Sequence, residues 1–382
     1  MQVTARQKQL LYNLWREGGL SRWELHKRTG FTPNGVGQVA GELLELGIIR
    51  EGVPQPSKAG RPRTPLEIDT QERHVAGMAI RRGQVSACRL NLRGQMISGM
   101  HVHKIDMTDH PEAVIETAAN LLPQVIDRKT LGVGVSVTGL IDPEAQSILF
   151  SSAVQGRSAT QGGISLHPIQ LAANDLPVLF DNDMHALAAR WALTHQAELN
   201  QDLLLVSISE GAVGAAMLVD GKPNRGCVLS ANEIGHTRFF VETEPCYCGH
   251  QGCLERICST GFLHMRNPND QRTLLEQAAV YRSGENDALE EVIQYLGMSL
   301  ANMVNFVRPN RLVLVSEVTR YPAFTDELLR RVRGAVLMNL VDRVQIDLWD
   351  QPAARNAETA GWLGLTGLYC EDWGGMHTNV PI

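Results

Sequence analysis

Three short segments with helical apolar spacing occupy the start of the chain, and a glycine follows each one. The segments run from Arg6 to Glu17, from Ser21 to Thr29 and from Pro33 to Leu46. Apolar residues recur within them every three or four positions, which is typical of helices with one buried face. Ser21 and Thr32 are favourable N-caps for the second and third helices. Three short helices followed by Ile48-Ile49 predict a winged helix-turn-helix domain over residues 1–53.

The apolar pattern changes beyond residue 71, where strands take over from short helices. Strands are expected at 75–80, 84–92, 95–101, 132–137, 203–207 and 311–315. A helix is expected at 111–126, between the third and fourth of these strands. Strands that alternate with helices predict an α/β sheet. A chain of 382 residues is long enough for two or three domains.

Charge is distributed unevenly along the chain. Residues 1–65 hold 10 Lys and Arg against 5 Asp and Glu, which leaves 25 and 36 for the remainder of a chain whose totals are 35 and 41. A basic N-terminal module on an acidic body indicates an anionic partner, with nucleic acid the first candidate. No apolar run approaches the ~18 residues of a membrane helix, and no signal-peptide pattern opens the chain. The seven cysteines show no disulfide framework, so we expect a cytoplasmic protein without a membrane partner.

The third helix is the candidate DNA-reading element. In a helix-turn-helix its N-terminal end enters the major groove, which makes Thr32, Asn34 and Gln38 candidate DNA contacts. Gly35 and Gly37 weaken this helix by up to ~1 kcal/mol each. Such glycines suit either a close approach to DNA or close packing between helices. The alternative interpretation is therefore a three-helix interaction module.

Residues 54–70 include a proline-rich stretch without hydrophobic periodicity. Within it, Gly60-Arg61-Pro62-Arg63 is typical of an extended hook whose arginines enter the narrow minor groove of A·T-rich DNA. We interpret this segment as a wing, with Arg61 and Arg63 as DNA contacts. The alternative is a plain interdomain linker.

A tight group of metal-binding residue types lies in the second half of the chain. His236, Cys246, Cys248 and Cys253 fall within 18 residues, which predicts a closed, structural zinc site. The alternative is a set of small buried cysteines or a disulfide pair. A zinc hydrolase is disfavoured, because three cysteines and a histidine leave no coordination position for water.

The same stretch carries a family resemblance. The pattern C-x-C-G-x-x-G-C-x-E after E-x-G-H resembles the signature of the ROK family, whose members are bacterial sugar kinases and sugar-responsive repressors. The segments 133–143 and 179–188 resemble two further motifs of that family. The resemblance implies an actin-like (ribonuclease H-like) two-lobed domain over residues 71–382. Its first lobe would span about 71–184 plus a C-terminal segment, and its second lobe about 185–360 with the zinc motif.

The resemblance also implies a sugar-binding set. Asp183 matches the general base of the family's kinases, and Asn182, Glu233 and Glu255 match residues that bond the other sugar hydroxyls. His236 belongs to the same set and is shared with the zinc site. Carboxylates form strong charge-assisted hydrogen bonds with hydroxyls. Asn182 and Asp183 could also serve only as a helix cap.

The phosphate-binding motifs of the kinases are degenerate here. The expected D-I-G-G-T is replaced by the sequence of residues 79–83, in which the aspartate is absent and Arg81-Arg82 replace both glycines. The second phosphate loop contains Glu210, and Ser316-Glu317 replace the adenosine glycines. Phosphoryl transfer depends on positioning and electrostatics around the phosphates. We therefore expect no ATP cofactor and no catalytic residue, with Asp183 a remnant of the general base.

Together these features predict a sugar-responsive DNA-binding regulator, most simply a repressor. Its expected partners are operator DNA, a sugar or sugar-phosphate effector bound in a cleft, and further copies of itself in a homodimer or homotetramer. Zinc is the expected cofactor, in a structural role. The alternative is a sugar kinase of the same fold with a fused helix-turn-helix.

Overall fold

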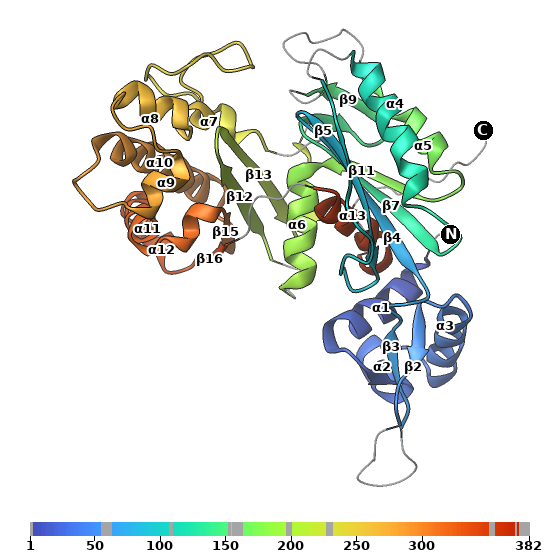
Figure 1. Cartoon of the computed structure of the whole chain (residues 1–382). Helices are drawn as coiled ribbons and strands as arrows, with labels where there is room; N and C mark the ends of the chain where they lie inside the picture. The colour runs from blue at the N-terminus through green and yellow to red at the C-terminus, as the bar shows by residue number, and fades with distance from the viewer. Residues whose placement is uncertain are drawn as a thin grey trace. The chain divides into compact units, whose positions relative to one another are not determined.

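A computed structural model describes residues 3–54, 63–106, 110–151, 154, 163–195, 201–226, 232–350, 356–370 and 373. The chain forms two compact units, the first comprising residues 1–196 and 355–382 and the second residues 197–354. The first unit contains the N-terminal module and a five-stranded sheet, and the second contains another five-stranded sheet (Figure 1).

The N-terminal module combines three helices with a small sheet. Its elements are α1 (Ala5–Glu17), β1 (Leu20–Ser21), α2 (Arg22–Thr29), α3 (Pro33–Glu45), β2 (Ile49–Glu51) and β3 (Pro65–Ile68). Capping boxes at Thr4 and Ser21 start α1 and α2, and the Thr32 hydroxyl accepts the Gly35 N–H at 3.1 Å to start α3. Strand β3 pairs antiparallel with both β1 and β2, so residues 52–64 connect two paired strands. Arg61 lies outside the described residues.

The large sheet of the first unit has the strand order β11-β7-β4-β5-β6. These strands are β4 (His74–Arg81), β5 (Gln84–Asn91), β6 (His101–Lys104), β7 (Thr130–Val137) and β11 (Val178–Asn182). A smaller sheet beside it contains β8 (Leu140–Asp142), β9 (Ser147–Phe150) and β10 (Ile164–Ser165). Strands β4, β7 and β11 run parallel, which places the ends of β7 and β11 at one edge.

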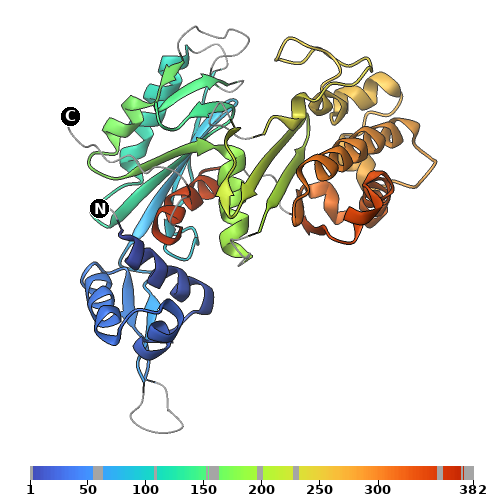
Figure 2. The same ribbon diagram turned by 180° about the vertical axis from the view of Figure 1, so that it is seen from behind.

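Helices cover both faces of this sheet (Figure 2). They are α4 (Pro111–Leu121), the short 3-10 helix η1 (Leu122–Gln124), α5 (His167–Ala172), α6 (Asp183–Thr194) and α13 (Ala357–Tyr369). Because side chains alternate along a strand, Ala76 and Met78 share a core with Val114 of α4, whereas Gly77 faces α13. A Cβ atom on Gly77 would overlap the Ala357 carbonyl oxygen. Helix α6 packs against α13, so the first unit extends beyond the boundary expected near residue 184.

The second unit is built on a sheet of order β14-β13-β12-β15-β16. Its strands are β12 (Leu203–Ser209), β13 (Ala212–Val219), β14 (Lys222–Pro223), β15 (Arg311–Val315) and β16 (Gln345–Trp349). Its helices are η3 (Ile234–His236), α7 (Leu254–Ile257), α8 (Thr260–Arg266), α9 (Leu274–Ala279), α10 (Asp287–Val307), η4 (Glu317–Arg320), α11 (Pro322–Ala335) and α12 (Met338–Val341). Buried aliphatic residues of β12, β15, α10 and α11 form its core. Across the residues that the structure describes, no helix is both long enough and apolar enough to cross a membrane.

Most of the expected strands correspond to observed ones, but two elements differ. The expected strand at 95–101 is wrong, because β6 begins only at His101. The segment before β6 forms only an isolated antiparallel bridge between Leu90 and Met96. The Ser98 hydroxyl accepts the Arg89 N–H, which a longer ladder would pair with a backbone carbonyl. The helix expected at 111–126 ends at Leu121 and continues as the 3-10 helix η1.

Candidate functional site

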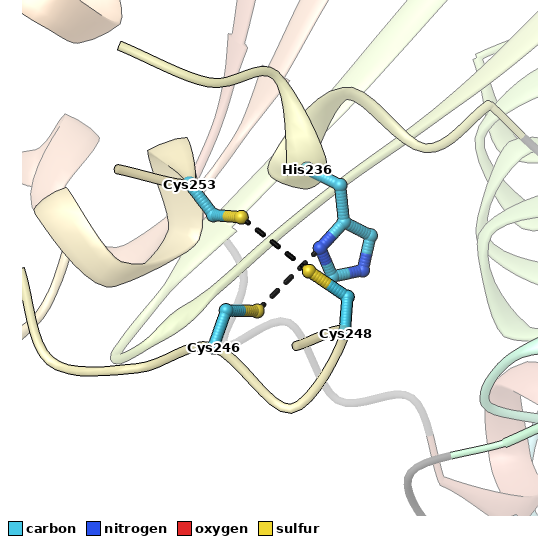
Figure 3. A group of neighbouring side chains, drawn as sticks. All are labelled: His236, Cys246, Cys248 and Cys253. Atoms are coloured by element: carbon cyan, nitrogen blue, oxygen red, sulfur yellow. Dashed lines mark hydrogen bonds between the residues drawn. The ribbon is translucent and has the colours of Figure 1, made fainter. Parts of the chain in front are cut away.

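The four expected zinc ligands lie together in the second unit. Their ligand atoms are all within 4.8 Å of one another. His236 comes from η3, Cys246 and Cys248 from the loop that follows, and Cys253 from the N-cap of α7 (Figure 3). Gly249 and Gly252 have positive φ angles of 90° and 78°, which glycine adopts readily. These turns direct the three sulfur atoms and the imidazole toward one point.

Two of the separations between these atoms fit a tetrahedral zinc ion closely. With ordinary Zn–S and Zn–N bond lengths, tetrahedral ligands lie about 3.8 Å apart for two sulfurs and about 3.6 Å apart for sulfur and nitrogen. The Cys248 and Cys253 Sγ atoms are 3.6 Å apart, and Cys246 Sγ is 3.6 Å from His236 Nδ1. A disulfide requires sulfur atoms about 2.05 Å apart. The geometry therefore favours a metal site over a disulfide pair.

A neighbouring hydroxyl fixes the orientation of the histidine. The Tyr247 hydroxyl lies 2.9 Å from His236 Nε2, and the two rings meet edge to face. This contact leaves Nδ1 directed at the sulfur atoms. Second partners of this kind commonly orient metal-bound histidines. Tyr247 was not singled out from the sequence, although its place between two cysteines was a usable signal.

Burial affects the thiols of the site. It raises the pKa of Cys253 to about 11 and raises that of Cys246 further. Cys246 also donates a hydrogen bond of 2.9 Å to the Glu255 carboxylate, which stabilises the protonated thiol. A metal ion would displace these protons, because thiolates are the ligands.

Two of the expected sugar contacts flank the cysteine–histidine cluster. Glu255 lies in the first turn of α7, is 4% exposed, and has Oε1 at 3.9 Å from His236 Nδ1. Glu233 precedes η3 and has Oε2 at 3.7 Å from His236 Nε2. Between them, Gly235 packs so closely on β13 that a Cβ atom would overlap the Val213 carbonyl oxygen. The structure thus brings together Glu233, His236 and Glu255 within the second unit.

Asn182 and Asp183 lie in the first unit, where β11 ends and α6 begins. Asn182 caps α6 by accepting the Met184 N–H at 2.7 Å, and its amide donates to the Gly139 carbonyl at 2.6 Å. Asp183 is 2% exposed and accepts a 2.7 Å hydrogen bond from the Thr138 hydroxyl. The capping role considered from the sequence is therefore present at Asn182. Thr138 was missed because its partner lies 45 positions away.

The candidate nucleotide positions of the second unit carry carboxylates. Glu210 accepts a short hydrogen bond from the Thr260 N–H at the start of α8. Glu210 and Glu317 both line a cavity of about 240 Å³ formed by residues 208–210, 273–275 and 316–318. Two carboxylates at a cavity wall repel phosphate groups.

The candidate DNA contacts are exposed where the structure describes them. Thr32, Asn34 and Gln38 all face solvent at the N-terminal end of α3. Arg63 is exposed and its guanidinium lies 4.4 Å from the ring centre of Trp23, a residue of α2 that is 52% exposed. Trp23 was not identified as functional from the sequence.

Comparisons with known proteins agree with this architecture. The model of the ROK family matches residues 76–371. The DNA-binding transcriptional dual regulator NagC of Escherichia coli (strain K12) is 24% identical over 326 residues, which cover 79% of this chain and 78% of that protein. The xylose repressor of Bacillus subtilis (strain 168) is 23% identical over 346 residues, which cover 87% of this chain and 88% of that protein.

Solved structures show the same fold. A ROK family transcriptional regulator, described as a homolog of the E. coli MLC protein, has a TM-score of 0.72 at 20% identity and covers 95% of this chain and 98% of its own. A ROK family glucokinase from Streptomyces griseus, in complex with glucose and AMPPNP, has a TM-score of 0.56 at 18% identity and covers 75% of this chain and 98% of its own. The predicted fold class is confirmed, and the chain belongs to the ROK family.

Proposed function

We propose that this chain is a sugar-responsive transcriptional repressor without kinase activity. The observation that carries the proposal is the extent of the two structural matches. Almost the whole glucokinase, 98% of its length, matches only 75% of this chain. The transcriptional regulator matches 95% of this chain. The family model begins only at residue 76, so the N-terminal module lies before it. Such a module is expected of a DNA-binding regulator.

DNA binding is proposed for α3 and for the connection between β2 and β3. Thr32, Asn34 and Gln38 are exposed at the end of α3 that enters the major groove in helix-turn-helix proteins. Arg61 and Arg63 are proposed to follow the minor groove as a wing, and the antiparallel pairing of β2 with β3 supports a wing rather than a linker. Helix-turn-helix proteins read two half-sites as dimers. The operator is therefore proposed to bind a homodimer or homotetramer.

The effector is proposed to be a sugar or a sugar phosphate. Relatives are named N-acetylglucosamine repressor and xylose repressor. The proposed contacts are Asn182 and Asp183 in the first unit and Glu233, His236 and Glu255 in the second. Their oxygen atoms suit hydroxyl groups, because a carboxylate accepts strong hydrogen bonds. Asp183 would act as a ligand contact, since no phosphate acceptor accompanies it.

Zinc is proposed as a structural cofactor held by His236, Cys246, Cys248 and Cys253. The distances above support a closed tetrahedral site. When bound, the ion would hold the loop between η3 and α7 and thereby keep Glu233 and Glu255 in place.

The absence of kinase activity is supported by the changed phosphate-binding positions. Arg81 and Arg82 occupy the end of β4 and the turn after it, where the kinases have glycines. In the second unit, the Thr260 N–H already donates a hydrogen bond to the Glu210 carboxylate. A backbone group already bonded to a carboxylate is a poor phosphate ligand.

Selection of duplexes from a random-sequence library tests this function. A specific duplex should emerge, and its affinity should change when sugars and sugar phosphates are added. A binding sugar at 100 times its dissociation constant should also stabilise the protein by about 2.7 kcal/mol. Failure to select any duplex, together with ATP-dependent sugar phosphorylation at ~1–100 per second, would instead establish the kinase alternative.

A further inference from the structure

The N-terminal module is fastened to the first unit through the last turn of α1. Trp15 of that helix is 7% exposed. Its ring meets Trp362 edge to face at 5.9 Å and lies 4.7 Å from the Tyr369 ring, and both partners belong to α13. Aromatic pairs at these distances add stabilisation beyond the area that they bury. The contact is thus a packed interface rather than a flexible tether.

Hydrogen bonds also hold the last turn of α1 in place. The Trp15 indole N–H donates to the Leu193 carbonyl at 3.0 Å in a buried position. The Arg93 guanidinium donates to the carbonyls of Trp15 and Leu14 at 2.7 and 3.0 Å. The last carbonyls of a helix lack partners within the helix and attract positive charge. Arg93 therefore bonds the C-terminal end of α1, and Trp15 of α1 bonds the end of α6 and joins the two helices.

A second attachment lies at the end of the proposed recognition helix. Arg73 donates to the Leu46 carbonyl at 2.8 Å and to the Arg128 carbonyl at 3.1 Å. Leu46 is the C-cap of α3, and Arg128 belongs to the connection before β7. The module is thus attached to the body of the first unit at the end of α1 and at the C-terminal end of α3, opposite the end of α3 that is proposed to contact DNA.

Helix α6 links this interface to the proposed sugar contacts. It begins at Asp183 and contains Leu193 in its last turn, so about 15 Å of helix separate the two residues. Nearly all of its side chains are buried. A packed helix shifts as one body, because close-packed interiors transmit strain. A displacement at Asp183 would consequently reach the carbonyl that Trp15 contacts.

We propose that Trp15 is a positioning residue that couples effector binding to DNA binding, through its hydrogen bond to the end of α6. This inference rests on the proposed function, because it assumes an effector at Asp183 and DNA at α3. Coupling between two sites is reciprocal. DNA bound at α3 must therefore also affect the beginning of α6.

The test uses the full-length protein and the variant Trp15→Phe. Phenylalanine keeps an aromatic ring against α13 and removes the donor to Leu193. Tyr12→Phe is the matched control, because Tyr12 lies on the same helix and its side chain interacts with Arg16 of that helix. The probes are a duplex selected by the wild-type protein and a panel of D-glucose, D-xylose, N-acetylglucosamine and their monophosphates.

The ratio of duplex dissociation constants with and without sugar measures the coupling. The wild-type protein and Tyr12→Phe should show a ratio of about tenfold, whereas Trp15→Phe should approach one, with sugar-free duplex affinity within about threefold of wild type. A wild-type ratio in Trp15→Phe would overturn the inference. So would a collapse of its sugar-free duplex binding, since Trp15 would then only support the fold of the module.

Hydrogen exchange with the duplex alone separates this inference from the proposed sugar response. In the wild-type protein, duplex binding should change amide exchange at residues 183–186, and Trp15→Phe should lose that change. If no sugar in the panel affects the wild-type protein, the proposed sugar response fails, and the exchange measurement still decides the link. Equal amide exchange at residues 183–186 with and without duplex in the wild-type protein refutes the coupling through Trp15. Failure to select a duplex refutes both this coupling and the proposed DNA-binding function.

Discussion

Replacing one cysteine of the proposed zinc site tests the structural role of the metal most directly. Cys253→Ser removes one of the four ligands, whereas Cys258→Ser changes a buried, free cysteine at the end of the same short helix. The two substitutions are chemically identical and lie five positions apart. A difference between the two variants therefore reports on metal binding rather than on the loss of a buried sulfur.

The size of the effect follows from the ligand set. Structural zinc sites contribute about 10–16 kcal/mol in peptides near neutral pH, or roughly 3 kcal/mol for each of four ligands. A loss of that size lowers the melting temperature by roughly 6–12 °C in a unit of this size. Cys258→Ser should cost less, since its metal site stays intact.

Zinc affinity should fall as the pH is lowered. Burial raises the pKa of Cys253 to about 11 and raises that of Cys246 above its usual range. Both thiols must lose a proton to bind the metal, so the zinc-bound protein holds fewer protons than the unfolded chain, and its stability rises with pH. These two thiols alone predict about a hundredfold loss of zinc affinity for each unit that the pH falls.

Elemental analysis and thermal unfolding measure these effects. Wild-type protein and Cys258→Ser should contain one zinc per chain, and Cys253→Ser should contain much less. Zinc release measured from pH 8 to pH 6 should show the steep dependence above. The reasoning is refuted if wild-type protein purified under reducing conditions contains no zinc, or if Cys253→Ser matches Cys258→Ser in zinc content and melting temperature.

Three further predictions concern DNA, the effector and catalysis. Gln38→Ala should reduce discrimination between the selected duplex and random DNA by ~1–3 kcal/mol. Arg63→Ala, and Trp23→Ala at the ring that Arg63 contacts, should instead weaken binding to the selected duplex and to random DNA alike and reduce the salt dependence by about one unit of slope. A loss of discrimination in the Arg63 variant, or an equal loss for both DNAs in the Gln38 variant, would contradict the proposed roles. Asp183→Asn should remove the effect of sugar on DNA affinity, at a cost of ~1–3 kcal/mol in sugar binding, and a wild-type response would exclude Asp183 as a contact. Neither the wild-type protein nor Glu210→Gly should phosphorylate a sugar in a coupled assay with ATP and magnesium, because the aspartate of the first phosphate motif is absent in both; turnover of ~1–100 per second would contradict this.

Much of the fold could be predicted because its signals are local. Two helices of the N-terminal module begin directly after Ser21 and Thr32, whose side chains cap the helix that follows. The buried strands β7 and β15 correspond to segments rich in aliphatic residues. The strand expected at 95–101 failed for the opposite reason. One backbone bridge joins Leu90 to Met96, but the Ser98 side chain takes the Arg89 N–H that a longer ladder would need.

The candidate site also combines contacts between sequence neighbours, which could be predicted, with contacts that depend on the fold. Three cysteines and a histidine within 18 residues predicted a metal cluster, because a short loop can bring such neighbours together with few alternatives. The contact of Tyr247 with His236 is nearly as local and could have been anticipated. The hydrogen bond from Thr138 to Asp183 could not, because it depends on the parallel pairing of β7 with β11.

The sequence by itself determined the family, the elements and the residue types available for zinc, sugar and DNA. Only the tertiary structure decided which distant groups meet. Trp15 reaches the Leu193 carbonyl across 178 positions, and Glu210 reaches the Thr260 N–H across 50. Such contacts leave no periodic or short-range pattern, because they arise from the packing of whole elements and not from the conformational preferences of neighbouring residues.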